Sequence, residues 1–191
     1  MGVMTATQPM TAEEFLALPE PPKWQRMELV EAELVMHFPT LLHQDATLEL
    51  AYALRSWTRS AHGRGLAVLS VDVLIDDRNI FGPDVLWYAE AAIPDMHSHR
   101  PYAVPHLAVE VRSPSTWRYD IGPKKATYER VGLRELWLVD TAASEVLVYR
   151  RSAPGASSFD VALELERADT LTSPMLEGFE VPLGELFPAP G

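Results

Sequence analysis

The chain has 191 residues, of which 47% are apolar and none is cysteine, and its formal net charge is −11 at pH 7. This length allows one sizeable hydrophobic core and is short for two. The lack of cysteine excludes disulfides, thiolate metal sites and a cysteine nucleophile. The negative charge disfavours casual binding to nucleic acid, because contacts with phosphate groups need local lysine and arginine.

The sequence contains no signal for secretion or membrane insertion. The first ten residues lack a basic segment followed by a long apolar run, and no later apolar run approaches the ~20 residues needed to span a bilayer. We therefore expect a cytoplasmic protein with no membrane partner. We expect a single domain over residues 11–187, with tails at residues 1–10 and 188–191.

The N-terminal part predicts a short helix followed by two strands. Thr11 and Glu14 have the spacing of a capping box, so a helix should begin there and run to Pro19. Residues 27–30 and 34–38 have the composition of short strands. The turn between them lacks the Asn-Gly or Asp-Gly pair that marks a strong hairpin.

The clearest helix begins after residue 40, because Leu50, Leu54 and Trp57 recur at helical spacing before two glycines at 63 and 65. A Val-, Leu- and Ile-rich run predicts one strand over residues 66–75. A turn should follow it, then a strand over residues 84–88 and a loop over residues 94–105.

A strand, a helix and a second strand are predicted next. Residues 107–111 form a nearly continuous apolar run, typical of a strand covered on both faces. Asp120 can cap a helix that ends at Gly132, and residues 136–139 form the second strand, which should pair with residues 146–150 as a hairpin. This order indicates a crossover unit within a mixed sheet, hence an α/β fold of α+β type with helices flanking the sheet.

Two acids in this frame suggest a metal site. Asp84 follows a proline, and Glu110 is the one charged residue of an apolar strand, where an unpaired acid is costly. Mg²⁺ and Mn²⁺ prefer carboxylate, water and phosphate oxygens. Two carboxylates ~4 Å apart repel by roughly 4 kcal/mol at an effective dielectric near 20, so a cation or a proton should accompany them.

One helix face could complete the site. Asp120, Lys124 and Tyr128 are four residues apart, so they lie along one side of the expected helix. An ammonium group near a metal could orient and help deprotonate the attacking water, or neutralise charge that builds on phosphorane-like oxygens. The alternative is ordinary: Asp84 ends a turn, Lys124 is a solvated helix lysine and Asp120 is a cap.

Several segments, taken in order, carry a resemblance to a known family. They are Met27–Leu34, Pro39 with His43, Pro83-Asp84, Val109–Ser115, Asp120 with Lys124 and Tyr128, and Val131–Asp140. Together they resemble the Uma-type family of restriction endonuclease-like proteins, which belongs to the PD-(D/E)XK nuclease superfamily. The resemblance extends from Thr11 to Phe187.

The resemblance implies a restriction endonuclease-like core with an N-terminal β-hairpin and a long helix, and a centre that uses Mg²⁺ (or Mn²⁺). It implies Asp84 and Glu110 as metal ligands, with Lys124 as the third catalytic residue. The usual superfamily lysine stands two residues after the glutamate, where this chain has Arg112. Because a guanidinium group does not deprotonate in ordinary proteins, activity depends on Lys124 reaching the site from the helix.

Four further residues are candidates for support of this centre. Asp120 and Tyr128 could hold the lysine, His43 could contact the site or the substrate, and Glu28 could add a third acid. A surface histidine and an outward-facing strand position are the simpler interpretations of His43 and Glu28.

These observations lead to one main hypothesis and two alternatives. The main hypothesis is a Mg²⁺-dependent endonuclease that hydrolyses phosphodiester bonds, with DNA as the substrate by resemblance and a homodimer as its form. The alternatives are a non-catalytic binding or assembly module on a nuclease fold, and a hydrolase of small phosphodiesters, for which the net negative charge matters less.

Overall fold

The structure, a computed structural model, describes residues 9–19 and 26–187 of the chain. Apart from positions 9 and 10, the expected tails lie outside the described residues. The helical segments are α1 (Ala12–Leu16), α2 (Leu41–Arg59), η1 (Glu90–Ala92), α3 (Trp117–Tyr119), η2 (Asp120–Lys124), α4 (Lys125–Arg130) and α5 (Leu183–Leu186). The strands are β1 (Arg26–Val30), β2 (Glu33–His37), β3 (Leu66–Leu69), β4 (Val73–Asp76), β5 (Asn79–Phe81), β6 (Val85–Tyr88), β7 (Leu107–Val111), β8 (Glu135–Asp140), β9 (Glu145–Arg150), β10 (Val161–Leu165), β11 (Thr170–Thr172) and β12 (Glu180–Pro182).

A mixed six-stranded sheet forms the centre of the fold, in the order β10-β9-β8-β7-β6-β3. Strands β7 and β8 are parallel and the other neighbours are antiparallel. The helical segments α3, η2 and α4 lie in the chain between these two parallel strands. The predicted crossover unit and mixed α+β fold are therefore confirmed.

A smaller antiparallel sheet has the order β2-β1-β5-β4, and its first two strands are the predicted hairpin. Glu31 and Ala32 at the turn have φ values of 52° and 67°. Residues other than glycine and asparagine rarely adopt this left-handed backbone region. Neighbouring residues hold this turn, since the amide of Glu31 donates to Asn79 Oδ1 at 2.9 Å and that of Ala32 to the Arg78 carbonyl at 2.8 Å.

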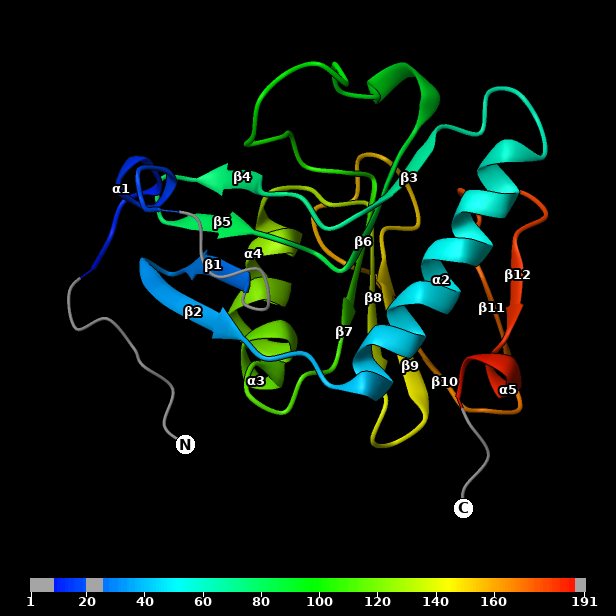
Figure 1. Cartoon of the computed structure of the whole chain (residues 1–191). Coiled ribbons are helices and arrows are strands. Elements are labelled where there is room, and N and C mark those ends of the chain that lie inside the picture. The colour runs from blue at the N-terminus through cyan, green and yellow to red at the C-terminus, as the bar shows by residue number, and fades with distance from the viewer. Residues whose placement is uncertain (1–8, 20–25, 188–191) are drawn as a thin grey trace.

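The two faces of the central sheet have different coverings. In Figure 1, α2 crosses the front of the sheet, and its buried side chains, among them Leu50 and Leu54, pack on Val109 of β7. The opposite face packs on α3, α4 and the small sheet. Because side chains alternate along a strand, Glu110 points away from α2 toward this second layer.

The predicted single strand over residues 66–75 is wrong. The chain leaves the six-stranded sheet after β3, crosses three residues, and enters the small sheet as β4, with β5 following as an unpredicted strand. Both halves are apolar because each packs in its own sheet, so composition alone did not reveal the break. Ser70 lies in the crossing and donates to the Gly82 carbonyl at 3.1 Å.

The predicted role of Asp120 as a helix cap is also wrong. Helical structure already begins at Trp117, and Asp120 has helical angles inside the segment, with its side chain turned toward Lys124. The helix ends as predicted, with Gly132 in the left-handed region at φ 87°. In the part of the chain that the structure describes, no helix has the length and apolar content to cross a bilayer.

Candidate metal centre

All seven candidate residues lie in one connected, buried cluster between the central sheet and the second layer. Each has a relative exposure of 6% or less. They come from β1, α2, the start of β6, β7, η2 and α4, and they are Glu28, His43, Asp84, Glu110, Asp120, Lys124 and Tyr128.

Lys124 is the hub of the cluster. Its ammonium group lies 2.8 Å from Glu110 Oε1, 3.0 and 3.1 Å from the two carboxylate oxygens of Glu28, and 3.1 Å from Asp120 Oδ1. The Lys124 side chain therefore extends from its helix to Glu110, as the proposed centre requires. The ammonium group also lies 5.5 Å from the centre of the Phe81 ring.

The irregular helix η2 positions this lysine. Gly122 within it has non-helical angles (φ −112°, ψ −105°), and Pro123 follows. Wide turns of this kind inside helices occur often at functional sites. Here the wide turn carries both Asp120 and Lys124, four residues apart, toward the sheet.

Asp84 lies opposite Glu110 at the end of the β6–β7 pairing. Its amide donates to the Val109 carbonyl at 2.8 Å, and the Val111 amide donates to its Oδ2 at 2.8 Å. Since Val85 pairs with Val109, the antiparallel register sets Asp84 across from Glu110 on the same face. Two adjacent strands thus present the two expected metal ligands side by side.

Other contacts of these acids come from the neighbouring layers. His43 Nε2 lies 3.2 Å from Asp84 Oδ2, so the first turns of α2 reach the cluster. The Tyr128 hydroxyl donates to Glu110 Oε1 at 2.8 Å. The tyrosine therefore holds the glutamate, whereas the sequence suggested that it would hold Lys124 or contact phosphate.

Two further members of the cluster, Arg26 and His37, were not among the residues predicted from the sequence. Arg26 Nη1 donates to Asp84 Oδ1 at 2.7 Å, and His37 Nε2 contacts Glu28 Oε2. The two residues are partners in the β1–β2 register. Strand alternation could have found Arg26, because it stands two residues before Glu28 and so shares its face.

The pKa values divide the acids into two groups. Burial alone would raise the pKa of Asp84, but the hydrogen bond from His43 and the charge of Arg26 lower it to about 2. Burial would likewise raise the pKa of Glu28, but the proximity of Lys124 and His37 holds it well below its usual value. These two acids are stabilised in their ionised form.

The other two acids show the opposite shift. Burial, joined by repulsion from the neighbouring carboxylates, raises the pKa of Glu110 well above its usual value in spite of Lys124. Burial and the charge of Glu28 raise the pKa of Asp120 to about 6. Burial alone would lower the pKa of Lys124, but the three carboxylates around its ammonium group raise it well above its usual value.

Arg112, at the usual lysine position, lies outside this network. Its Nη1 contacts both carboxylate oxygens of Asp140, at 2.7 and 2.8 Å, and its guanidinium group lies 5.6 Å from the Trp117 ring centre. Two further basic residues of this part of the chain also have partners, since Arg130 binds Asp76 at 2.5 Å and Lys124 is buried among carboxylates.

Comparison with known proteins identifies the family of the chain. The Uma2 family, described as "Putative restriction endonuclease", matches residues 12–184. The chain belongs to this family. No protein of curated function matches the sequence significantly.

A solved structure supports the fold of this Uma2 chain. It is titled as a putative nuclease belonging to DUF820 from Anabaena variabilis, and it superposes with a TM-score of 0.77 over 94% of this chain and 98% of its own. The sequence identity is 20%, so the likeness concerns the fold. The nuclease-like fold expected from the sequence is confirmed.

The donor set fits a hard divalent cation. Four carboxylates face the positive charges of Lys124 and Arg26, which leaves two negative charges uncompensated when all four acids are ionised. No three Asp, Glu or His side chains within residues 9–19 and 26–187 are arranged to hold a metal by themselves. Asp84 and Glu110 would therefore hold it with water or substrate oxygens, as is usual for Mg²⁺.

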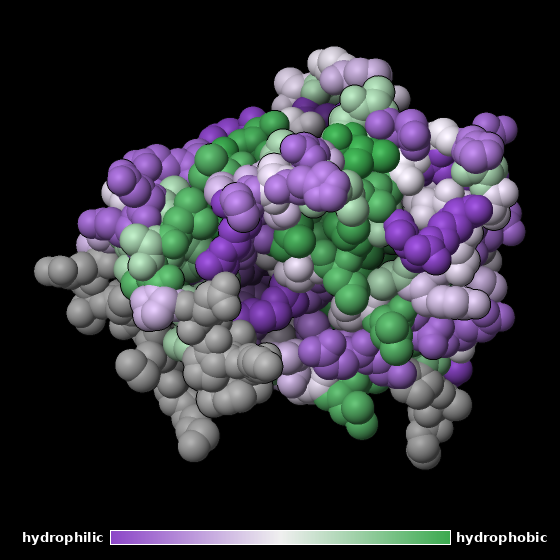
Figure 2. All heavy atoms as spheres, turned by 45° about the horizontal axis from the view of Figure 1, so that its top comes forward, coloured by the Kyte–Doolittle hydropathy of each residue, from purple (hydrophilic) through white to green (hydrophobic). Residues whose placement is uncertain are grey.

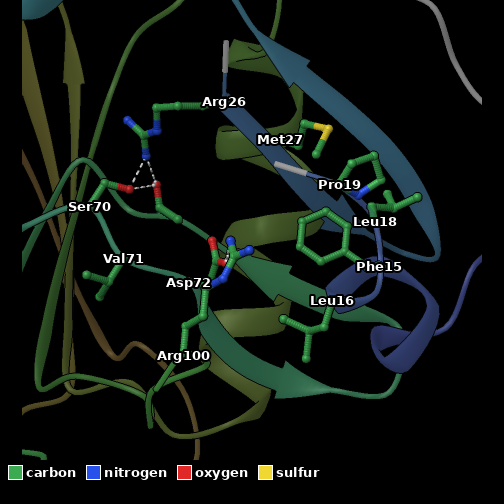
Figure 3. A pocket seen from close by; sticks show the side chains of 11 residues that line it. Phe15, Leu16, Leu18, Pro19, Arg26, Met27, Ser70, Val71, Asp72 and Arg100 are labelled. Atoms are coloured by element: carbon green, nitrogen blue, oxygen red, sulfur yellow. Dashed lines mark hydrogen bonds and ion pairs between the residues drawn. The ribbon is translucent and has the colours of Figure 1, made fainter. Parts of the chain in front are cut away.

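A pocket of about 260 Å³ adjoins the cluster at Arg26 and Gly82. Figure 3 shows Arg26 and Ser70 on one side of it, Phe15 on the other, and the ion pair of Asp72 with Arg100. Figure 2 shows hydrophilic residues in a hollow near the middle of the view. The Arg26 side chain, 32% exposed, thus connects buried Asp84 with the surface.

Proposed function

We propose that the chain is a Mg²⁺-dependent nuclease of the PD-(D/E)XK type that hydrolyses phosphodiester bonds in DNA. The observation that carries the proposal is the contact of the Lys124 ammonium group with Glu110, in a cluster where Asp84 lies on the adjacent strand. We propose Mg²⁺ or Mn²⁺ as the cation, a single domain over residues 11–187 and a cytoplasmic setting.

When bound, the metal would activate water and stabilise negative charge on the phosphate. Asp84 would be its ionised ligand, because its pKa is about 2. Glu110 would be the second ligand, and its raised pKa means that cation binding displaces a proton from it.

Lys124 acts as a charge donor in this proposal. The three carboxylates around its ammonium group raise its pKa well above its usual value and so favour the charged form. It would orient the attacking water or neutralise charge that develops on the phosphate oxygens. Tyr128 would fix the orientation of Glu110 through its 2.8 Å hydrogen bond.

The test is cleavage of plasmid and linear DNA by the purified chain with and without Mg²⁺. We expect cleavage by the unaltered chain, at least a 100-fold loss in Asp84→Asn and Lys124→Met, and unchanged activity in Arg112→Gln. Circular dichroism must show that each variant is folded. Full cleavage activity in a folded Asp84→Asn variant would show that Asp84 is not part of the catalytic centre.

A small phosphodiester is a second candidate substrate, because Arg112, Lys124 and Arg130 already have acidic partners and are not free for a long polyanion. The pocket beside Arg26 would hold a small substrate. Hydrolysis of bis(p-nitrophenyl) phosphate with little dependence on salt, together with failure to cut DNA, would favour this candidate.

A non-catalytic module is the third candidate, because Lys124 and Arg26 already occupy positions beside the carboxylates where a cation would bind. In that case the cluster is a structural salt-bridge network. A calorimetric titration with Mg²⁺ and Mn²⁺ separates it from the nuclease.

A further inference from the structure

Arg26 is the most exposed member of the charged cluster. Its side chain is 32% exposed, whereas that of Asp84 is 7% exposed and that of Lys124 is 1% exposed. The pocket of about 260 Å³ is lined by Arg26 and not by Asp84, and Figure 3 shows the arginine at one side of it. A molecule that approaches Asp84 from this pocket therefore meets the Arg26 guanidinium group first.

Acceptors of two kinds hold this guanidinium group. Its Nη1 donates to Asp84 Oδ1 at 2.7 Å, which is a contact between charges. Its Nη2 donates to two neutral oxygens, Ser70 Oγ and the Gly82 carbonyl. The neutral oxygens fix one edge of the group, so only the other edge depends on a carboxylate.

The backbone at Gly82 leaves room for this arrangement. A Cβ atom at this position would lie 3.2 Å from Arg26 Nη2 and 3.1 Å from Ser70 Oγ, so a side chain would crowd the guanidinium group. The Gly82 amide donates to Glu28 Oε1 at 2.5 Å, which connects the support of Arg26 to the cluster. The arginine is thus held at the edge of the pocket by the fold itself.

The chemistry of the guanidinium group suits an exchange of anions. Its planar fork of N–H groups matches the oxygens of a carboxylate and those of a phosphate. When the charge of Asp84 is neutralised, the free edge of Arg26 lacks an anion. A phosphate group that enters from the pocket would supply one, and the contacts with Ser70 and Gly82 would stay in place.

We infer that Arg26 is a substrate-binding residue, which exchanges the Asp84 carboxylate for a phosphate group of DNA at the mouth of the pocket. The inference rests on the proposed function, because it names the residue that contacts the substrate of the same centre. Arg26 covers Asp84 in the free chain and holds the phosphate when Asp84 is neutral. Binding of DNA and the charge of Asp84 are therefore coupled through one side chain.

The test is a double-mutant cycle on the binding of a short fluorescein-labelled DNA duplex, measured by anisotropy in EDTA so that no cleavage occurs. Asp84→Asn removes the charge that competes for Arg26, and it should bind DNA about tenfold more tightly than the unaltered chain. When Arg26→Gln is also present, the same substitution should change the dissociation constant by less than about twofold. With Arg26→Lys the gain should be intermediate, because the charge is kept and the planar fork is lost.

Two further measurements separate a phosphate contact from a general effect of charge. Asp140→Asn is the matched control, because Asp140 pairs with Arg112 at the same distance of 2.7 Å and Arg112 is 33% exposed, yet this pair lies outside the cluster. It should not tighten binding. In Asp84→Asn, the slope of log K against log salt should be steeper by about 0.9 than in the unaltered chain, as expected for one additional phosphate contact.

Circular dichroism must show that each variant is folded, and Asp84→Ser, which also lacks the charge, replaces Asp84→Asn if the latter is not. A gain in affinity that requires Arg26 supports the inference. Equal gains with and without Arg26, an equal gain in Asp140→Asn, no gain in Asp84→Asn, or no DNA binding at about 100 µM chain would each overturn it. Since the cycle measures binding without metal, its result is separate from that of the cleavage assay.

Discussion

Adjacent residues of β7 face two regions that are equally buried and differ in their chemistry. Val109 joins Leu50 and Leu54 in a dry apolar layer under α2, and its burial stabilises the fold directly. Glu110, on the opposite face, lies among charged groups around Lys124. Burying such a cluster costs free energy that ion pairing offsets only in part, and an apolar replacement is often as stable or more so. The difference points to chemistry, not stability, as the reason for the charged layer.

Removal of the central lysine should give the largest effect. Lys124→Met leaves three carboxylates without their shared ammonium group, and we expect a loss of about 3–5 kcal/mol in the free energy of unfolding at neutral pH. Leu54→Ala, in the apolar layer, should cost about 2–5 kcal/mol. Urea unfolding gives both values.

The pH dependence separates these two losses. Acids left without Lys124 have raised pKa values, so the destabilisation of Lys124→Met should diminish as the pH falls and they become protonated. The loss in Leu54→Ala should not change with pH. Parallel pH profiles for the two variants would contradict the contrast between the layers.

Asp120→Asn should stabilise the protein, whereas substitutions that remove atoms from the apolar layer should destabilise it. The folded-state pKa of Asp120 is about 6, raised from 3.8, so wild-type stability decreases as the pH rises from about 4 through about 6. The variant lacks this decrease and should exceed the wild type by up to about 3 kcal/mol above pH 6 and match it near pH 4. Urea unfolding across this range is the measurement, and a variant less stable than the wild type above pH 6 would count against the raised pKa.

The sign is opposite for Asp84. Its pKa is lowered to about 2, so its stabilising effect is present above about pH 4 and is lost as the pH falls toward 2. The same cluster thus contains one acid that stabilises the fold by being ionised and another that destabilises it. Such opposed pKa shifts are typical of functional sites.

Arg26→Gln should strengthen metal binding. The guanidinium group lies 2.7 Å from Asp84 Oδ1, where it competes with any other cation for that oxygen. We expect calorimetry to show a dissociation constant for Mg²⁺ that is several-fold lower than that of the unaltered chain. Arg112→Gln is the matched control and should not change the affinity, so equal constants in the two variants would show that Arg26 does not compete.

Arg112→Lys should have the smallest effect. Its ion pair with Asp140 is partly exposed and lies outside the cluster, so the free energy of unfolding should change by about 1 kcal/mol or less. The cleavage rate should stay the same, although the substitution restores a lysine at the usual superfamily position. A large gain in rate would mean that position 112 belongs to the centre.

The sequence predicted the central strands of the large sheet well and the path of the chain between the two sheets poorly. Residues 107–111 and 136–139 were predicted as neighbouring strands because both are almost entirely apolar and a helical segment lies between them. The break after Leu69 was missed because residues on both sides of it are apolar and pack in different sheets. Periodicity reports that a residue is buried and not the sheet in which it lies.

The sequence predicted most residues of the candidate cluster but few of the contacts between them. Order along the chain and the resemblance suggested Asp84, Glu110 and Lys124. Helical spacing did not predict the irregular turn at Gly122 and Pro123 that directs Lys124 inward, although a Gly-Pro pair inside a helix is a turn signal. Strand alternation places Arg26 on the face of Glu28, but its contact with Asp84, 58 residues later, arises only from the packing of two sheets.

The central claim is that the charged layer is a metal centre, and a calorimetric titration with Mg²⁺ and Mn²⁺ tests it most directly. We predict one site per chain in the unaltered protein, with affinity that increases with pH as Glu110 and Asp120 lose their protons, and no site in folded Asp84→Asn. Absence of binding at millimolar metal, or equal binding by Asp84→Asn, would contradict the account and leave the cluster as a structural ion-pair network.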